Sequence, residues 1–209
     1  SIFDIAIAHK LKIIEDSCEA MFVKSKDCPV GGWGDISCYS MYVAHLITTG
    51  VGGIATTDEP EYAEYMRSLV NHGRDNIYIN IDDGKDRTEE VIGKRFLFDK
   101  VGHSFRITEM EAAIGLPQLE EWEIMINKRQ RHALELNNGL RKYNIQLPLN
   151  RPDADHAFMM YPLVCQQDGI RDNLVAFLES EGIETRRMLP LTNQPVYKDL
   201  FKEDDYPIA

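Results

Sequence analysis

The sequence has few of the features that mark several classes of protein. Its four cysteines, Cys18, Cys28, Cys38 and Cys165, form neither a disulfide framework nor the spacing of a zinc site. Acidic residues outnumber Lys and Arg by 34 to 23, and the net charge of -11 argues against nucleic-acid binding. No apolar run approaches the roughly 20 residues that span a bilayer, and no signal peptide is evident. These absences predict a reducing, cytoplasmic setting with no membrane partner.

Short apolar strands alternate with amphipathic helices along the 209 residues. The pattern predicts helices over residues 2–9, 61–71, 108–119, 122–143 and 171–181. It predicts strands over residues 11–14, 36–43, 53–57 and 158–165, and another beginning at 183. This order is typical of an α/β fold with a mostly parallel sheet.

A Pro-containing stretch at residues 147–152 follows the long fourth helix and is the best candidate for a domain boundary. We therefore expect residues 1–145 to form part of a large domain with its connecting helix. Residues 146–209 would form part of a smaller C-terminal domain. Because the chain begins without Met, inside a helix-strand unit, we expect a fragment of a longer protein.

Polar residues follow two of the predicted strands. Asp16 follows strand 11–14, and Ser40 and His45 lie around the end of strand 36–43, before the glycine run at 50–53. Ligands of open α/β sheets bind beyond the carboxyl ends of the strands, and small hydroxyls and glycines can approach a phosphate. Taken singly, however, Asp16 equally suits a turn or helix cap, His45 a hydrogen-bonded structural residue, and the glycines a turn.

Taken together and in order, these residues resemble one family, the DegT/StrS sugar aminotransferases. The stretch 13–16, Ile-Ile-Glu-Asp, is similar to its strand ending in a pyridine-binding aspartate, and 37–42 to its strand before the cofactor lysine. Residues 106–113 are similar to its R-x-T-E-x-x-A-A helix start. The resemblance spans essentially the whole chain. It implies the fold of aspartate aminotransferase, with pyridoxal phosphate (PLP) or pyridoxamine phosphate (PMP) as cofactor.

The resemblance also implies roles for individual residues. Asp16 would keep the pyridine nitrogen protonated, and Ser40 would bind the cofactor phosphate. Glu19 stands where the family has a glutamine or histidine near the cofactor ring. Ser104 stands where many members have an asparagine that reaches the phosphate of the neighbouring subunit, which implies a homodimer with shared active sites. Arg186 would meet a phosphate of the nucleotide-sugar substrate or of the cofactor, although a surface arginine is an equally good interpretation.

One departure from the family pattern changes the implied chemistry. The family's cofactor lysine is replaced by His45, and no lysine occurs between Lys26 and Lys85. A histidine cannot form the Schiff base of transamination, but it can act as a base. Residues 43–50 resemble a branch with histidine here, the nucleotide-sugar 3-dehydratases that use PMP. That resemblance implies loss of the 3-hydroxyl of an NDP-4-keto-6-deoxyhexose, with His45 removing a proton from the cofactor's C4′ carbon.

Some members of that branch carry a [2Fe-2S] cluster. Cys18 falls where one ligand lies, but Asn76 and Tyr78 stand where those members have a Cys-x-Cys. A cluster of this kind needs four thiolates, so we expect neither an iron–sulfur cluster nor another metal.

Two further interpretations stay open. A sugar aminotransferase is the activity that the family name suggests, and the missing lysine opposes it. Val51 stands where most members have glutamate in the glycine run. Together with His45 and Ser104, it also allows a catalytically altered, PLP-binding or structural homologue.

Overall fold

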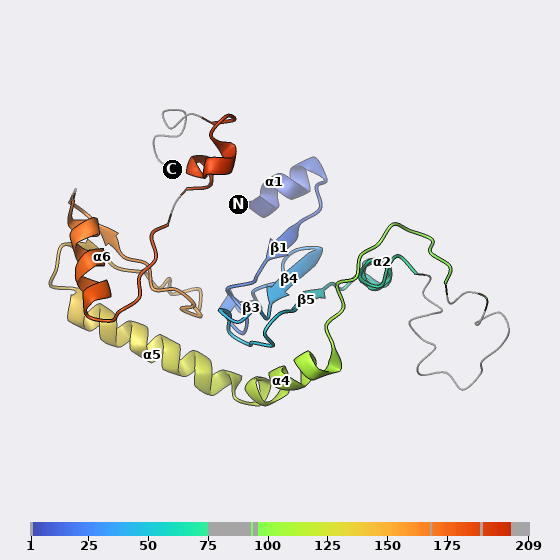
Figure 1. Cartoon of the computed structure of the whole chain (residues 1–209), viewed down its shortest axis with the longest axis horizontal. Helices are drawn as coiled ribbons and strands as arrows, with labels where there is room; N and C mark the ends of the chain where they lie inside the picture. The colour runs from blue at the N-terminus through green and yellow to red at the C-terminus, as the bar shows by residue number, and fades with distance from the viewer. Residues whose placement is uncertain (1, 75–92, 94–95, 168, 189, 202–209) are drawn as a thin grey trace. The chain divides into compact units, whose positions relative to one another are not determined.

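The computed structural model describes residues 2–74, 93, 96–167, 169–188 and 190–201 (Figure 1). The helices are α1 (Ile2–His9), α2 (Pro60–Val70), α4 (Glu109–Glu120), α5 (Trp122–Leu140) and α6 (Ile170–Ser180), with the short 3-10 turns η2 (Leu191–Asn193) and η3 (Pro195–Tyr197). The strands are β1 (Ile14–Asp16), β2 (Lys24–Ser25), β3 (Cys28–Pro29), β4 (Ile36–Ser40), β5 (Gly53–Thr56), β6 (Ile145–Gln146) and β7 (Val164–Cys165).

The chain divides into two compact units. Unit 1 runs to Lys142 and takes in Leu147–Pro162, whereas unit 2 consists of Tyr143–Gln146 and the residues from Leu163 onward. In unit 2, β6 and β7 pair antiparallel ahead of α6. The boundary between residues 145 and 146, which we expect for the domains of the whole protein, stays a prediction.

A three-stranded sheet in the order β1-β4-β5 forms the centre of unit 1 (Figure 1). β1 and β4 run parallel, with Asp16 opposite Cys38, whereas β5 runs antiparallel to β4, with Gly53 opposite Ser40. The carboxyl ends of β1 and β4 and the start of β5 therefore lie at the same edge of the sheet. That edge carries the polar residues singled out in the sequence.

The hydrophobic core lies beside this edge and draws heavily on the loop between β4 and β5. Its buried residues are Met21, Val23, Met41, Leu46, Ile47, Ile126 and Ala157. Phe22 and Trp122, at the start of α5, stack on one another with ring centroids 5.0 Å apart. Burial of several apolar side chains fixes a loop that would otherwise be mobile, because each contributes roughly 1.5–3 kcal/mol.

Helix α4 begins at the Thr108 capping box that the sequence predicts. The hydroxyl of Thr108 accepts the backbone N–H of Glu111, and the Glu111 carboxylate accepts the Thr108 N–H at 2.6 Å. This capping box satisfies two backbone donors at the start of α4. Hydrogen bonds from the Thr108 backbone and hydroxyl also lower the pKa of Glu111.

Several strands have other bounds than the sequence pattern predicts. β1 covers Ile14–Asp16 rather than residues 11–14, because the Leu11 N–H still bonds to Ala6 O at the end of α1. No strand follows α6 in the described part of unit 2, where the Ile183 N–H returns to Leu178 O after Gly182 at φ 78°. The N–H groups of Leu11 and Ile183 therefore end helices, although the sequence pattern places both residues in strands.

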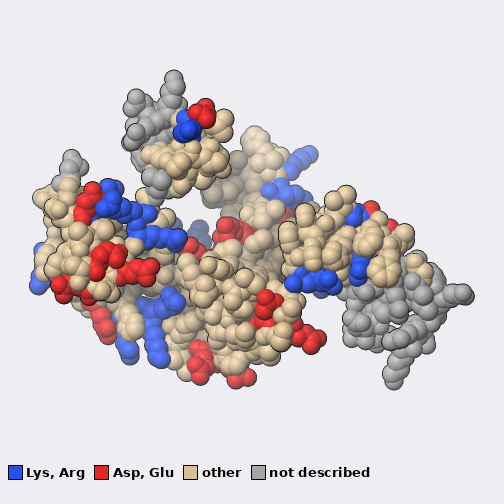
Figure 2. Space-filling view, viewed as in Figure 1, with Lys and Arg blue, Asp and Glu red and all other residues tan. Residues whose placement is uncertain are grey.

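The surface of the described residues carries both signs of charge, and Figure 2 shows acidic and basic side chains side by side on its viewed face. None of the described helices combines the length and apolarity that crossing a membrane requires. Among the described residues, no three His, Cys, Asp or Glu side chains gather as metal ligands would. Asn76 and Tyr78, on which the expectation about the iron–sulfur cluster depends, lie outside the described residues.

Candidate active site

The sheet edge brings Asp16 and Ser40 onto neighbouring strands. Asp16 is the last residue of β1, and Ser40 is the last residue of β4. The Ser17 N–H continues the parallel ladder to Cys38 O at 2.9 Å, so the chain leaving β1 stays against β4. The strand ends are therefore held in register where ligands of α/β sheets bind.

The Asp16 carboxylate is exposed and ionised. Its Oδ1 accepts the Cys18 N–H at 3.3 Å. The side chain of Cys18, then its backbone N–H, lowers the pKa of Asp16 by hydrogen bonding, and electrostatic interaction with His45 lowers it further. An anion with this depressed pKa keeps its charge at any physiological pH.

His45 approaches the same turn from the β4–β5 loop. Its Nδ1 lies 2.7 Å from the carbonyl oxygen of Cys18. The backbone N–H of His45 donates to Tyr42 O at 2.9 Å. The rings of Tyr42 and His45 meet edge to face, with their centroids 6.5 Å apart. The ring is half-buried. The structure thus joins Asp16 and His45 through a single residue, Cys18.

The loop that carries His45 is anchored on both sides of the ring. Leu46 and Ile47, the next two residues, are only 3% and 4% exposed. The Thr49 N–H donates to Met41 O at 2.9 Å, and the Met41 N–H donates to Gly52 O at 3.0 Å. These bonds close the loop at the end of β4, so the imidazole projects from a fixed backbone.

Gln118 of α4 forms hydrogen bonds with the backbone of the β4–β5 loop. Its Oε1 accepts the Thr48 N–H at 3.0 Å, and its Nε2 donates to Thr48 O at 2.7 Å. Gly115, one turn earlier, lies so close that a β-carbon there would stand 3.1 Å from Thr49 Cγ2. The loop is therefore part of the rigid scaffold rather than a flexible connection.

The other predicted cofactor residues of unit 1 have simpler surroundings. The half-buried Ser40 accepts the Tyr42 N–H on its Oγ at 3.2 Å, which leaves its hydroxyl proton to donate elsewhere. Glu19 is exposed, and its charge helps to raise the pKa of Cys18. Ser40 and Glu19 thus flank the turn at 16–18.

Ser104 is exposed and lies in a different part of unit 1. It forms an isolated antiparallel bridge with Asn71, at the end of α2. The Arg106 guanidinium lies 3.3 Å from His72 Nε2, and the rings of His103 and Phe105 stack 4.6 Å apart. The structure does not bring Ser104 to Asp16 and His45 within the chain, and its role toward a neighbouring subunit stays a prediction.

Arg186 belongs to unit 2 and is exposed. The neighbouring Thr185 is held by the Glu179 carboxylate, which accepts the Thr185 N–H at 2.6 Å. The predicted contact of Arg186 with a phosphate stays a prediction.

Sequence reasoning missed two contributions to the site. The Cys18 carbonyl carries no sequence signal, since every residue has one and only the backbone path aims it at His45. The Glu15 carboxylate accepts the N–H groups of Gly31, Trp33 and Gly34 and ties the following turn to β1. An acid beside Asp16 was visible in the sequence, but its partners lie at least 16 residues away.

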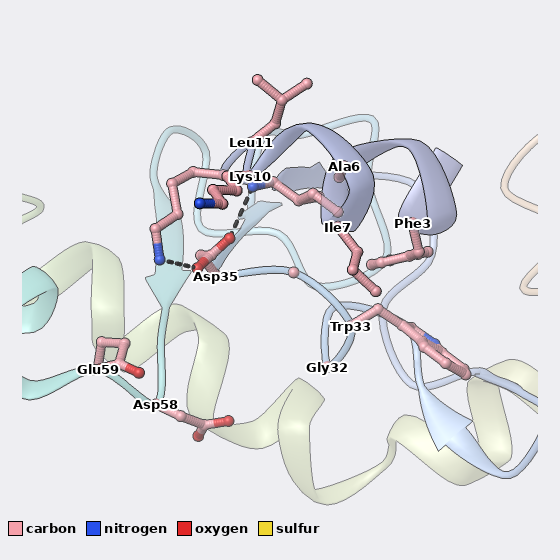
Figure 3. A pocket seen from close by; sticks show the side chains of 13 residues that line it. Phe3, Ala6, Ile7, Lys10, Leu11, Gly32, Trp33, Asp35, Asp58 and Glu59 are labelled. Carbon is pink, nitrogen blue, oxygen red and sulfur yellow. Dashed lines mark hydrogen bonds and ion pairs between the residues drawn. The ribbon is translucent and has the colours of Figure 1, made fainter. Parts of the chain in front are cut away.

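A pocket of about 610 Å³ lies at the opposite end of the strands (Figure 3). Phe3 and Ile7 of α1 face the turn at Trp33, and Lys12 pairs with Asp35 at 2.8 Å. None of the six predicted site residues lines this pocket. The candidate active site is therefore the open edge around Asp16 and His45.

Comparison with known proteins identifies the architecture. The pattern of the DegT/DnrJ/EryC1/StrS aminotransferase family matches residues 1–209. The chain belongs to this family. The family's fold, that of the PLP-dependent aminotransferases, is also found in a solved E. coli structure, GDP-4-keto-6-deoxy-D-mannose-3-dehydratase with bound hydrated PLP. That structure superposes with a TM-score of 0.79 at 24% identity, over 94% of this chain and 52% of that chain.

Curated members of this DegT family with similar identity carry different activities. The dTDP-4-dehydro-2,6-dideoxy-D-glucose 3-dehydratase of Saccharopolyspora spinosa is 30% identical over 95% of the chain and 46% of its own length. The GDP-perosamine synthase of Caulobacter vibrioides is 30% identical over 97% of the chain and 52% of its own length. The chain thus spans about half the length of the curated relatives that it matches.

The residues present fit the cofactor that this family uses. A protonated pyridine nitrogen needs an anion beside it, and Asp16 is an exposed carboxylate with a lowered pKa. A phosphate needs donors, and the Ser40 hydroxyl has its proton available because its oxygen accepts from Tyr42. The carboxylate at the end of β1 and the hydroxyl at the end of β4 therefore have the chemistry that the two ends of PLP or PMP require.

Proposed function

We propose that the protein is a PLP/PMP-dependent enzyme that removes the 3-hydroxyl of an NDP-4-keto-6-deoxyhexose, with His45 as the base. The observation that carries the proposal is the imidazole, in place of an amine, held 2.7 Å from Cys18 O beside the Asp16 turn. No lysine occurs between Lys26 and Lys85 to replace it. The 30% identity to a curated 3-dehydratase supports the same reaction.

The cofactor would be held at the ends of β1 and β4. PMP supplies an amine for the 4-keto group and a conjugated ring that takes up the electrons of the broken bond. Asp16 would hold the protonated ring nitrogen, Ser40 would donate to the phosphate, and Glu19 would lie by the ring. Each of these roles uses a group that is exposed or half-buried in unit 1.

His45 would move the proton at the cofactor's C4′ carbon. A neutral imidazole is a competent base near pH 7, and fixing its backbone limits the positions that the ring can take. In this proposal the 3-hydroxyl leaves as the proton is removed. Arg186 would meet a phosphate of the nucleotide sugar, as a guanidinium suits oxyanions.

The remaining parts of the proposal concern the whole protein. Ser104 would reach the cofactor phosphate of the neighbouring subunit, so that a homodimer shares its two active sites. The enzyme would work in the cytoplasm, in deoxysugar and polysaccharide biosynthesis. Neither an iron–sulfur cluster nor another metal would take part.

Two treatments of the full-length protein test the proposal. Borohydride added to the PLP-loaded protein should give no reduced lysine adduct, whereas a lysine adduct would contradict it. Incubation with PMP and an NDP-4-keto-6-deoxyhexose should remove the 3-hydroxyl, detected by mass spectrometry, and His45→Asn should abolish that loss.

A sugar aminotransferase is the second candidate. The GDP-perosamine synthase of Caulobacter vibrioides is as similar to the chain as the dehydratase is. An amine in place of the 4-keto group, formed without loss of the 3-hydroxyl, would favour this alternative. No turnover of several nucleotide sugars by a folded protein would favour a catalytically altered homologue, to which Val51 points.

A further inference from the structure

We propose that the Cys18 backbone carbonyl is a positioning group that holds neutral His45 in the Nδ1–H tautomer and so makes Nε2 the basic atom. This inference rests on the proposed function for its catalytic meaning. The tautomer itself is a property of the folded protein and can be measured without turnover.

The first step of the argument is the hydrogen bond itself. Nδ1 of His45 lies 2.7 Å from Cys18 O. A carbonyl oxygen has no proton, so it can only accept, and Nδ1 must carry the hydrogen. A neutral imidazole has one N–H, and its Nε2 is then left with the lone pair.

The second step concerns the other ring nitrogen. Within the described ranges, no hydrogen-bond partner faces His45 Nε2. His45 is half-buried, and the Tyr42 and His45 rings meet edge to face. Nε2 is therefore the nitrogen available to a bound molecule at the sheet edge.

The third step is the fixation of the carbonyl. The Asp16 carboxylate holds the Cys18 N–H at 3.3 Å, and the Cys18 thiol lies 3.7 Å from Cys38 O on β4. The Ser17 N–H bonds to Cys38 O, and the Ala20 N–H bonds to Ser17 O. The residue that orients the base is thus held by the predicted cofactor-binding carboxylate, and the two functional groups are set by one turn.

His156 provides a control inside the same chain. Its Nδ1 accepts the Phe158 N–H at 2.8 Å. A backbone amide can only donate here, so neutral His156 carries its hydrogen on Nε2. The structure therefore assigns opposite tautomers to His45 and His156.

Solid-state ¹⁵N NMR of the full-length protein, labelled on histidine, tests the assignment above the pKa of the imidazoles. The His45 signals, identified by their loss in His45→Asn, should show a protonated Nδ1 and an unprotonated Nε2, and those of His156 the reverse. A proton on Nε2 of His45, or an even mixture of both forms, would overturn the inference.

Two substitutions separate this role from a general structural one. The side-chain amide introduced by His45→Asn can still donate to Cys18 O, whereas the amide introduced by His45→Gln lies near the place of Nε2. Melting temperature should fall by roughly 2–4 °C more in His45→Gln than in His45→Asn, and equal melting temperatures would contradict the bond. A correct tautomer without dehydration would sink only the proposed function, and dehydration with the wrong tautomer would sink only this inference.

Discussion

At the scale of single residues, Cys18 has a strongly raised thiol pKa. Burial, followed by hydrogen bonding to the Asp16 side chain and by nearby negative charge, raises the pKa of its thiol to about 11. A thiol reacts as thiolate, so roughly one molecule in a thousand is reactive at pH 8. The thiol is accordingly a packing group, and the role proposed for Cys18 belongs to its backbone carbonyl.

Alkylation measures this property. We expect iodoacetamide at pH 8 to modify Cys18 on the order of 100-fold more slowly in the folded protein than in urea. Peptide mass spectrometry over a time course gives the rate at each cysteine in one sample. Equal rates at Cys18 in the folded and unfolded states would contradict the raised pKa.

Ser17, directly after β1, and Ser37, on the neighbouring strand β4, form a matched pair. Both are 1% exposed, but the Ser37 hydroxyl donates to Gly31 O at 2.6 Å, whereas Ser17 Oγ has no partner among the described residues. Ser17→Ala should therefore raise the free energy of unfolding by about 1 kcal/mol, and Ser37→Ala should lower it by about 1 kcal/mol. Urea denaturation measures both changes, and the same sign for the two would refute the assignment.

The lowered pKa of Asp16 makes the stability of the folded protein fall as the solution becomes acidic. Its folded pKa lies below the ordinary value of 3.8, so its stabilising contribution is complete above that value. The contribution is lost as the pH falls through the lower folded pKa. The difference in melting temperature between wild type and Asp16→Asn should thus shrink as the pH falls below roughly 3. A difference that grows on acidification would contradict this sign.

At the scale of elements, α4 and the β4–β5 loop depend on one another. Gln118 satisfies both backbone groups of Thr48, which lie partly buried. Gln118→Ala should lower the free energy of unfolding by about 2 kcal/mol, since the two hydrogen bonds to the Thr48 backbone are lost. Gln118→Glu keeps an acceptor for the Thr48 N–H but sets a carboxylate oxygen against Thr48 O, so a loss at least as large is expected. Wild-type stability in both variants, by urea denaturation, would show that α4 does not hold the loop.

The elements also show what a sequence can predict. α1 and the start of α4 follow from local signals, namely apolar spacing and the Thr108–Glu111 capping box. β7 was predicted too long, and β1 was predicted too early in the chain, because the bounds of a strand depend on partners elsewhere in the chain. At Phe158, predicted as strand, the backbone is left-handed at φ 46° and its carbonyl accepts from Arg129. Contacts of this range leave no local pattern.

The candidate site also has a part that the sequence predicts and a part that it does not. Asp16, Ser40 and His45 were predicted at one sheet edge, and the register of β1 against β4 brings them there. The link through Cys18 O could not be predicted, since it depends on a backbone path. Glu19, Ser104 and Arg186 keep their predicted roles as proposals, because these roles involve a cofactor, a second subunit or a substrate.

At the scale of the whole molecule, the curated relatives of similar identity include a dTDP-sugar 3-dehydratase and a GDP-perosamine synthase. A lysine at the end of β4 would both hold the cofactor and move the proton, whereas a histidine can only move the proton. Under the proposed function, position 45 therefore separates removal of a hydroxyl from addition of an amine. The anchoring of the β4–β5 loop by Leu46, Ile47 and Gln118 keeps that position fixed in either case.

The most direct test is the identity of the product. Full-length protein, PMP and an NDP-4-keto-6-deoxyhexose labelled with ¹⁸O in the 3-hydroxyl should release labelled water and yield a sugar without the label. A product that keeps the ¹⁸O and carries an amine at carbon 4 would contradict the account.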